Sequence, residues 1–396
     1  MKASIWLLLI IIVVSCNSGR EKTTSIPTDS IPALDTLQVI EIDTVKKDKS
    51  LDALAAYIAG ISQRDSNVFT LFEKDPYWEN FKSSTDSNWN RIDTERFSKM
   101  GEWQESNLNS KLNDSLKLFY PFSGPDFLHA YYLYPMVSEY ILAALEPIQE
   151  VPRLDTLTTE LRDRFFDSLA YSMKDVFRKS YFITLKMRKD IKNVKGVLPP
   201  LYFFIERTGH ELLAQSFFYL DSTGTEISIP GSQLHSHKFP GVRLKFRNIL
   251  TRQIKQLYYV NVDVSNDGLK ENPQFQKFIA RKGPYNTFIK SASYLLHKKP
   301  FTEIKKIIVE NSLSLFQDDT GIPYKDFKNR LDWNLELFGD YETPVKGFAD
   351  RFQRDLDSAY KTKISKTEIP FSIGYHWDTK KQNYMLVRKS EAIITK

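Results

Sequence analysis

The residues best suited to chemistry lie in a short loop that follows an apolar segment. The segment FYPFSGPDF (119–127) holds three of them: Tyr120, Ser123 and Asp126. If 118–122 form a strand and 127–134 a helix, the loop lies at the carboxyl end of a strand, where open α/β sheets bind ligands. Two interpretations follow for Asp126. It accepts a hydrogen bond from a neutral or cationic ligand, or it only stabilises the start of the helix, where acids are favoured.

Further candidate ligand-binding residues are His210, Asp318 and Asp319. The triplet Asp319-Thr320-Gly321 matches that of aspartic proteases, whose two carboxylates share a proton. No second copy occurs and Ile322-Pro323 follows, so a turn that closes a helix over 301–316 is favoured. His210, in RTGHE, is expected at a hairpin tip. The catalytic alternative pairs Asp126 with Asp318 or Asp319 in a hydrolase acting on glycan or peptide.

Other catalytic and cofactor signatures are absent from the sequence. His235 and His237 could face one way on a strand, but no carboxylate or third histidine lies nearby, so we predict a polar loop and no metal. The chain contains no nucleophile elbow, no phosphate-binding loop and no dinucleotide fingerprint. We therefore predict no cofactor, and we leave catalytic residues unassigned.

The N-terminus predicts export and lipid attachment. Lys2 is followed by ten apolar residues, Ile5 to Val14, about half the length that a membrane-spanning helix needs. The run ends in Val-Val-Ser-Cys, which resembles the lipobox of bacterial lipoproteins. That resemblance implies that 1–15 are a signal peptide and that Cys16 is lipidated. Because Asn17 follows instead of the aspartate that commonly retains lipoproteins at the inner membrane, we expect the outer membrane.

Composition limits the partners. The 396 residues carry a formal charge of +6, with 55 bases against 49 acids, so nothing indicates nucleic acid as a partner. A single cysteine cannot form an internal disulfide. The basic stretch 174–195, with eight bases and two acids, could rest on anionic headgroups, but a solvated helix end is the simpler explanation.

Element patterns predict a mixed fold without repeats. Residues 16–50 form the lipidated N-terminus and a flexible tether, rich in Ser, Thr, Asp, Lys and Pro. We expect the globular body at 51–396, either as one part or as a helical part (51–115) followed by a mixed α/β part (116–396). Within it, apolar residues recur every four positions from Leu157 to Phe177, which predicts a long helix. Strands are expected at 201–206, 211–220, 242–249 and 256–264, and a helix at 286–297. An α/β or α+β fold follows, with helices packed on a mixed sheet.

Four blocks carry a resemblance that covers most of the body. They are FYPFSGPDF (119–127), ALEP (144–147), DDTGIP (318–323) and LFGDY (337–341). Together they resemble an uncharacterised family of exported bacterial proteins with a YPFSGPD block. That family implies no activity. We expect a lipid-anchored cell-envelope protein that binds or assembles with an envelope protein, peptide or glycan, and the hydrolase is the alternative.

Overall fold

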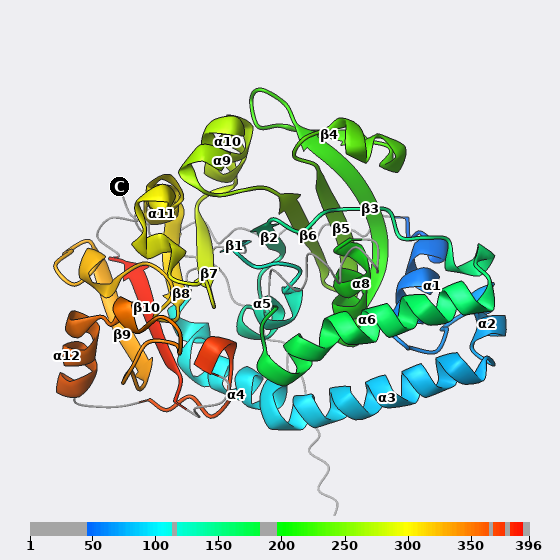
Figure 1. Ribbon diagram of the computed structural model, residues 1–396, viewed down its shortest axis with the longest axis horizontal. Helices are drawn as coiled ribbons and strands as arrows, with labels where there is room; N and C mark the ends of the chain where they lie inside the picture. The colour runs from blue at the N-terminus through cyan, green and yellow to red at the C-terminus, as the bar shows by residue number, and fades with distance from the viewer. Residues whose placement is uncertain (1–45, 113–116, 183–195, 364–366, 377–380, 391–396) are drawn as a thin grey trace, which may run out of the picture. The chain divides into compact units, whose positions relative to one another are not determined.

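The computed structural model describes residues 46–112, 117–182, 196–363, 367–376 and 381–390. The signal peptide, Cys16 and most of the tether lie outside this part of the chain. The described residues belong to one compact unit. Its centre is a ten-stranded mixed sheet packed by helices, which confirms the predicted fold class (Figure 1).

Five parallel strands form the middle of the sheet. The strand order is β4-β3-β5-β6-β2-β1-β7-β8-β10-β9, and the block from β6 to β8 is parallel while both flanks are antiparallel. The strands are β1 Lys117–Pro121, β2 Glu139–Ala144, β3 His210–Leu220, β4 Glu226–Ile229, β5 Gly241–Asn248, β6 Ile254–Asn261, β7 Tyr285–Ile289, β8 Ser312–Gln317, β9 Trp333–Gly339 and β10 Asn383–Lys389.

Both faces of the central sheet are buried. In β2, Tyr140 and Leu142 join the core on one face, while Ile141 and Ala143 join the core on the other. This explains why YILAA is a continuous apolar run without polar alternation, as expected for a parallel strand covered on both sides.

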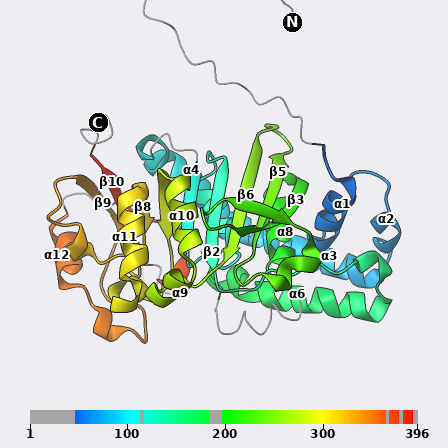
Figure 2. The same cartoon turned by 90° about the horizontal axis from the view of Figure 1, so that it is seen from above.

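Two groups of helices supply these cores. The first face is covered by α1 Lys49–Ile58, α2 Phe69–Phe72, α3 Pro76–Ile92, α4 Ser98–Asn107, α5 Phe127–Leu133, α6 Thr159–Lys179 and α8 Leu198–Arg207. The second is covered by α9 Asn266–Glu271, α10 Pro273–Lys282, α11 Thr302–Asn311 and α12 Arg354–Thr362. Figure 2 shows α1 beside β3 towards one edge of the sheet and α12 beside β9 at the other.

Three expected elements differ from the structure. Residues 201–206 belong to helix α8, because Pro199 and Pro200 occupy its first turn, where proline is preorganised for a helix, and burial on all sides hides the periodicity. The helix expected at 286–297 begins instead as β7, where Thr287, Phe288 and Ile289 fill a central strand. The helix expected at 301–316 ends at Asn311 and continues as β8.

The crossovers place a crevice at one point of the sheet. From β1 the chain crosses to β2 through α5, which packs on the first face. From β7 it crosses in the opposite direction to β8 through α11, on the second face. The connections therefore diverge beyond the carboxyl ends of β1 and β7, which are neighbours. Such a switch point is where doubly wound sheets open a binding crevice.

Candidate functional site

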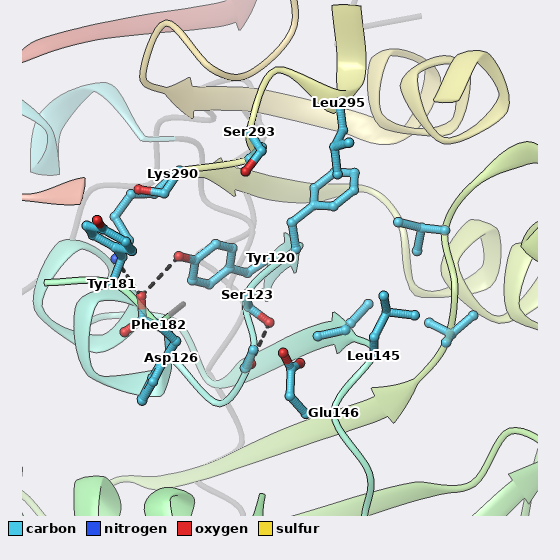
Figure 3. Close-up of a pocket in the computed structure, with 18 of the residues that line it drawn as sticks. Tyr120, Ser123, Asp126, Leu145, Glu146, Tyr181, Phe182, Lys290, Ser293 and Leu295 are labelled. Atoms are coloured by element: carbon cyan, nitrogen blue, oxygen red, sulfur yellow. Dashed lines mark hydrogen bonds and ion pairs between the residues drawn. The ribbon is translucent and has the colours of Figure 1, made fainter. Parts of the chain in front are cut away.

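A cavity of about 160 Å³ lies at this switch point (Figure 3). Its walls are the residues that directly follow β1, β2, β6 and β7, closed by Tyr181, Phe182 and Tyr375. The polar and charged residues that line the cavity are Ser123, Asp126, Glu146, Asp263, Lys290 and Ser291. Its apolar walls include Phe122, Leu145, Val262, Leu295 and Phe301. The space is close to that of an engineered cavity that holds one benzene ring, so it suits a single small group.

Asp126 is held by four contacts at the edge of the cavity. It is the N-cap of α5, where Oδ1 accepts hydrogen bonds from the His129 backbone N–H (3.3 Å) and from Nδ1 (2.7 Å). Oδ2 accepts from the Tyr120 hydroxyl (3.1 Å) and pairs with Lys290 Nζ (2.8 Å). Figure 3 shows Tyr120 and Lys290 directed at this carboxylate. The helix-start interpretation of Asp126 is thus confirmed, and a buried ion pair is added to it.

Burial sets the charge states of this cluster. Burial would raise the pKa of Asp126, but His129 and Lys290 outweigh it and hold the pKa well below its usual value. Burial also lowers the pKa of His129 to about 4, so at neutral pH this ring is neutral and donates its Nδ1–H to Asp126. Burial lowers the pKa of Lys290 as well, and the Asp126 carboxylate only partly opposes it.

The cavity loops adopt a left-handed backbone that side chains rarely take. Phe122 (φ 62°), Ser291 (φ 56°) and Ser293 (φ 51°) all line the cavity. Each non-glycine residue in this conformation costs about 1–3 kcal/mol of folding free energy. Such residues therefore occur where surrounding contacts hold the backbone in place, often at binding sites. The loop after β8 holds Ser291 in this conformation, because the Ser291 N–H donates to Asp318 Oδ2 (2.8 Å) and the Ala292 N–H donates to Thr320 Oγ1 (2.7 Å).

One residue that lines the cavity has a buried hydroxyl without a hydrogen bond. Ser291 Oγ has no partner among the described residues. A buried polar group left unpaired costs about 1–3 kcal/mol, and this hydroxyl lies against Gly374 with no surface open to the cavity, so the cost is borne by the loop after β7. Ser123 Oγ differs, because it donates to the Gly124 carbonyl at 2.8 Å.

Asp318 and Asp319 lie behind the β7 loop and do not line this cavity. Thr320 donates to Asp318 Oδ1 from its N–H (3.0 Å) and its hydroxyl (2.5 Å), so the predicted turn at 318–321 is present, after a strand and not after a helix. Burial and the neighbouring Asp319 raise the pKa of Asp318 to about 6. Asp319 accepts from Tyr294 (2.5 Å) and contacts His376 Nε2 (2.9 Å). Both carboxylates are thus used to fix loops.

His210 lies apart from the cavity. It begins β3, bonds Thr208 Oγ1 through Nδ1 (3.0 Å), and packs edge-on against Tyr131 and Phe246. Burial lowers its pKa to about 4. The structure therefore brings Tyr120, Ser123 and Asp126 together in the lining of the cavity. Asp318 and His210 do not line it.

Sequence reasoning missed Glu146, Lys290 and Ser291. Glu146 follows β2 and is only 2% exposed, and Figure 3 shows its carboxylate turned towards Ser123. Lys290 and Ser291 directly follow β7. Reading 286–289 as a strand would have identified both, because residues just past parallel strands converge at one edge.

The lining chemistry favours a neutral or cationic group. Lys290 is balanced by Asp126, and the lining also contains Glu146 and Asp263. Across the described ranges, no cluster of three or more His, Cys, Asp or Glu could hold a metal ion. His237 instead stacks on Tyr219 at 4.2 Å.

In the described part of the chain, no helix is both long and apolar enough to cross a membrane.

Comparison with known proteins gives no relative whose site could be compared with this one. No family model, no curated protein and no solved structure matches the chain.

Proposed function

We propose that this chain is a lipid-anchored protein of the bacterial cell envelope, attached through Cys16, whose cavity binds a small neutral or cationic group of a glycan or peptide. The observation that carries the binding function is the cavity at the switch point of the sheet, whose lining combines apolar walls with the polar side chains of Ser123, Asp126 and Glu146. The fixed left-handed loops support it, because a preformed site loses little entropy on binding.

Binding is favoured over hydrolysis by the state of the aspartates. A glycosidase needs two carboxyl groups facing the scissile bond. Here Asp126 is saturated by α5, Tyr120 and Lys290, while Asp318 is saturated by the loops that it fixes. Neither carboxylate is available as an acid or a nucleophile for a ligand in the cavity, so we infer that both side chains hold the surrounding loops in position.

Ligand screening with a blocking variant tests the proposal. The purified protein is titrated by calorimetry with glucosamine, N-acetylglucosamine, short peptides and the anionic probe glucose 6-phosphate. Leu145→Trp should abolish binding, because Leu145 lines the cavity and is 45% exposed, so the larger side chain can fill the cavity without disturbing the core.

Leu250→Trp is the matched control, since Leu250 is 90% exposed and lies outside the cavity lining. Equal binding by both tryptophan variants, or binding of only the phosphorylated sugar, would overturn the proposal.

A further inference from the structure

A second and larger hollow separates helices α3 and α6. Figure 1 shows these helices side by side. They run parallel, because Asp75 near the start of α3 faces Arg162 (3.8 Å) and Arg96 just beyond its end donates to the Val176 carbonyl (3.3 Å). The space between them is about 560 Å³.

The hollow exists because the facing side chains are too short to fill it. The α3 side contributes Asn80, Ser84, Thr85 and Asn88, and α6 contributes Ala170 at the same level. These residues recur three or four positions apart, so they occupy one face of each helix. Phe81 of α3 packs against Phe166 of α6 with ring centroids 4.6 Å apart, and beyond this contact the short side chains leave space between the helices.

The floor of the hollow is apolar. It is built from Phe81, Phe166, Leu169, Met173, Phe177 and Phe203. Leu169 and Met173 are at most 1% exposed, so the floor is continuous with the core beneath, while Ser84 and Ala170 on the rim are exposed. Phe81 and Phe177 are half-buried, so part of the apolar floor is accessible between the polar rims, as in a groove that takes an apolar chain.

The two ends of the groove differ in charge. At the end near the start of the helices, the Tyr77 hydroxyl donates to Asp167 and closes the groove. At the other end lie three bases, Arg91, Lys174 and Arg178, of which Arg91 also pairs with Glu95 at 2.9 Å. Bases near helix C-termini offset the helix dipole, which explains why bases occur at this end. The dipole does not explain the apolar hollow that leads to them.

We propose that the α3–α6 groove binds a long-chain fatty acid, with its acyl chain on the phenylalanine floor and its carboxylate among Arg91, Lys174 and Arg178. Three bases and one acid line the groove, and that acid lies at the closed end. An anionic head at the open end and an apolar tail towards Tyr77 therefore match the groove. This inference is independent of the cavity beside Asp126, since the two share no lining residue.

A fluorescent fatty acid tests the site. The purified protein is titrated with 11-(dansylamino)undecanoic acid below its micelle concentration, and bound probe is displaced with palmitate. Ser84→Trp should abolish saturable binding, because the indole fills the groove. Ser87→Trp is the matched control on the same helix, where Ser87 is exposed and outside the lining. Thermal melts confirm that both variants fold.

A second arm tests the charge. Lys174→Glu should weaken palmitate binding by roughly fivefold, as expected for an exposed ion pair, and leave the methyl ester of palmitate unaffected. Lys99→Glu, at an exposed position of α4, changes the net charge of the protein by the same amount as Lys174→Glu and should bind palmitate as the wild type does.

The proposal is overturned if Ser84→Trp binds the probe as tightly as Ser87→Trp. It is also overturned if the wild type shows no saturable binding, or if it sediments with anionic vesicles but does not bind monomeric probe. Equal affinity for palmitate and its methyl ester would refute the role of the bases.

Discussion

Breaking the Asp126–Lys290 pair should cost far more than loss of a helix cap. An acid that serves only the helix dipole contributes about 0.3–1 kcal/mol. Here the two side chains are each about 2% exposed and 2.8 Å apart. Removing one partner of a buried pair leaves an uncompensated charge and costs about 3–5 kcal/mol. We therefore expect Asp126→Asn and Lys290→Met each to lower the free energy of unfolding by that amount.

The double variant separates the pair from the cap. Asn retains N-capping, so Asp126→Asn changes mainly the charge. With both charges removed, the loss should be smaller than the sum of the single losses, with a coupling energy of about 1–3 kcal/mol. Urea unfolding followed by circular dichroism measures all four proteins, and linear extrapolation gives the free energies.

The pH dependence supplies a further check. The pKa of Asp126 lies below its ordinary value of 3.8 in the folded protein, so its contribution is present above that pH and is lost as the pH falls through the folded pKa. The cost of Asp126→Asn should thus be constant from pH 5 to 7 and shrink below pH 4. A loss under about 1 kcal/mol in both single variants, with additive effects, would refute the ion-pair argument.

Three other measurements test separate parts of the account. Cys16→Ser should abolish labelling by a fatty-acid analogue and membrane fractionation, and label kept at the wild-type level would end the lipoprotein proposal. A chain that begins at residue 46 should melt like one that begins at residue 17. A chain that begins at 51 should be less stable by at least about 1 kcal/mol, because it loses the Asp48 cap of α1 and the ion pairs of Lys47 with Asp52 and Glu211; equal melting of all three would contradict this. His210→Phe should reduce the loss of stability on acidification by up to roughly 3 kcal/mol between pH 6.5 and 4. The reason is that the pKa of His210 is about 4 when folded and 6.5 when unfolded, so only the unfolded chain gains the proton in this range; unchanged pH dependence would argue against a buried neutral ring.

The candidate site was partly predictable because its loop chemistry is local. Gly124 takes a left-handed backbone (φ 57°) and Asp126 caps α5, and both follow from residue types at fixed offsets. Lys290 could not be assigned in the same way. It is 164 residues from Asp126, and its role depends on β7 pairing beside β1.

The sequence by itself determined the class of fold, the strand–loop–helix unit at 117–133 and the turn at 318–321, because apolar periodicity and capping are local properties. Only the tertiary structure decided that LYFFIE is a helix and that 285–289 is a central strand. Both segments are buried on all sides, so no alternation of exposed and buried residues marks their type, and burial against distant elements selects the conformation. The same holds for the cavity and for the groove, since each is formed by side chains that only the packing of the sheet and of α3 against α6 brings together.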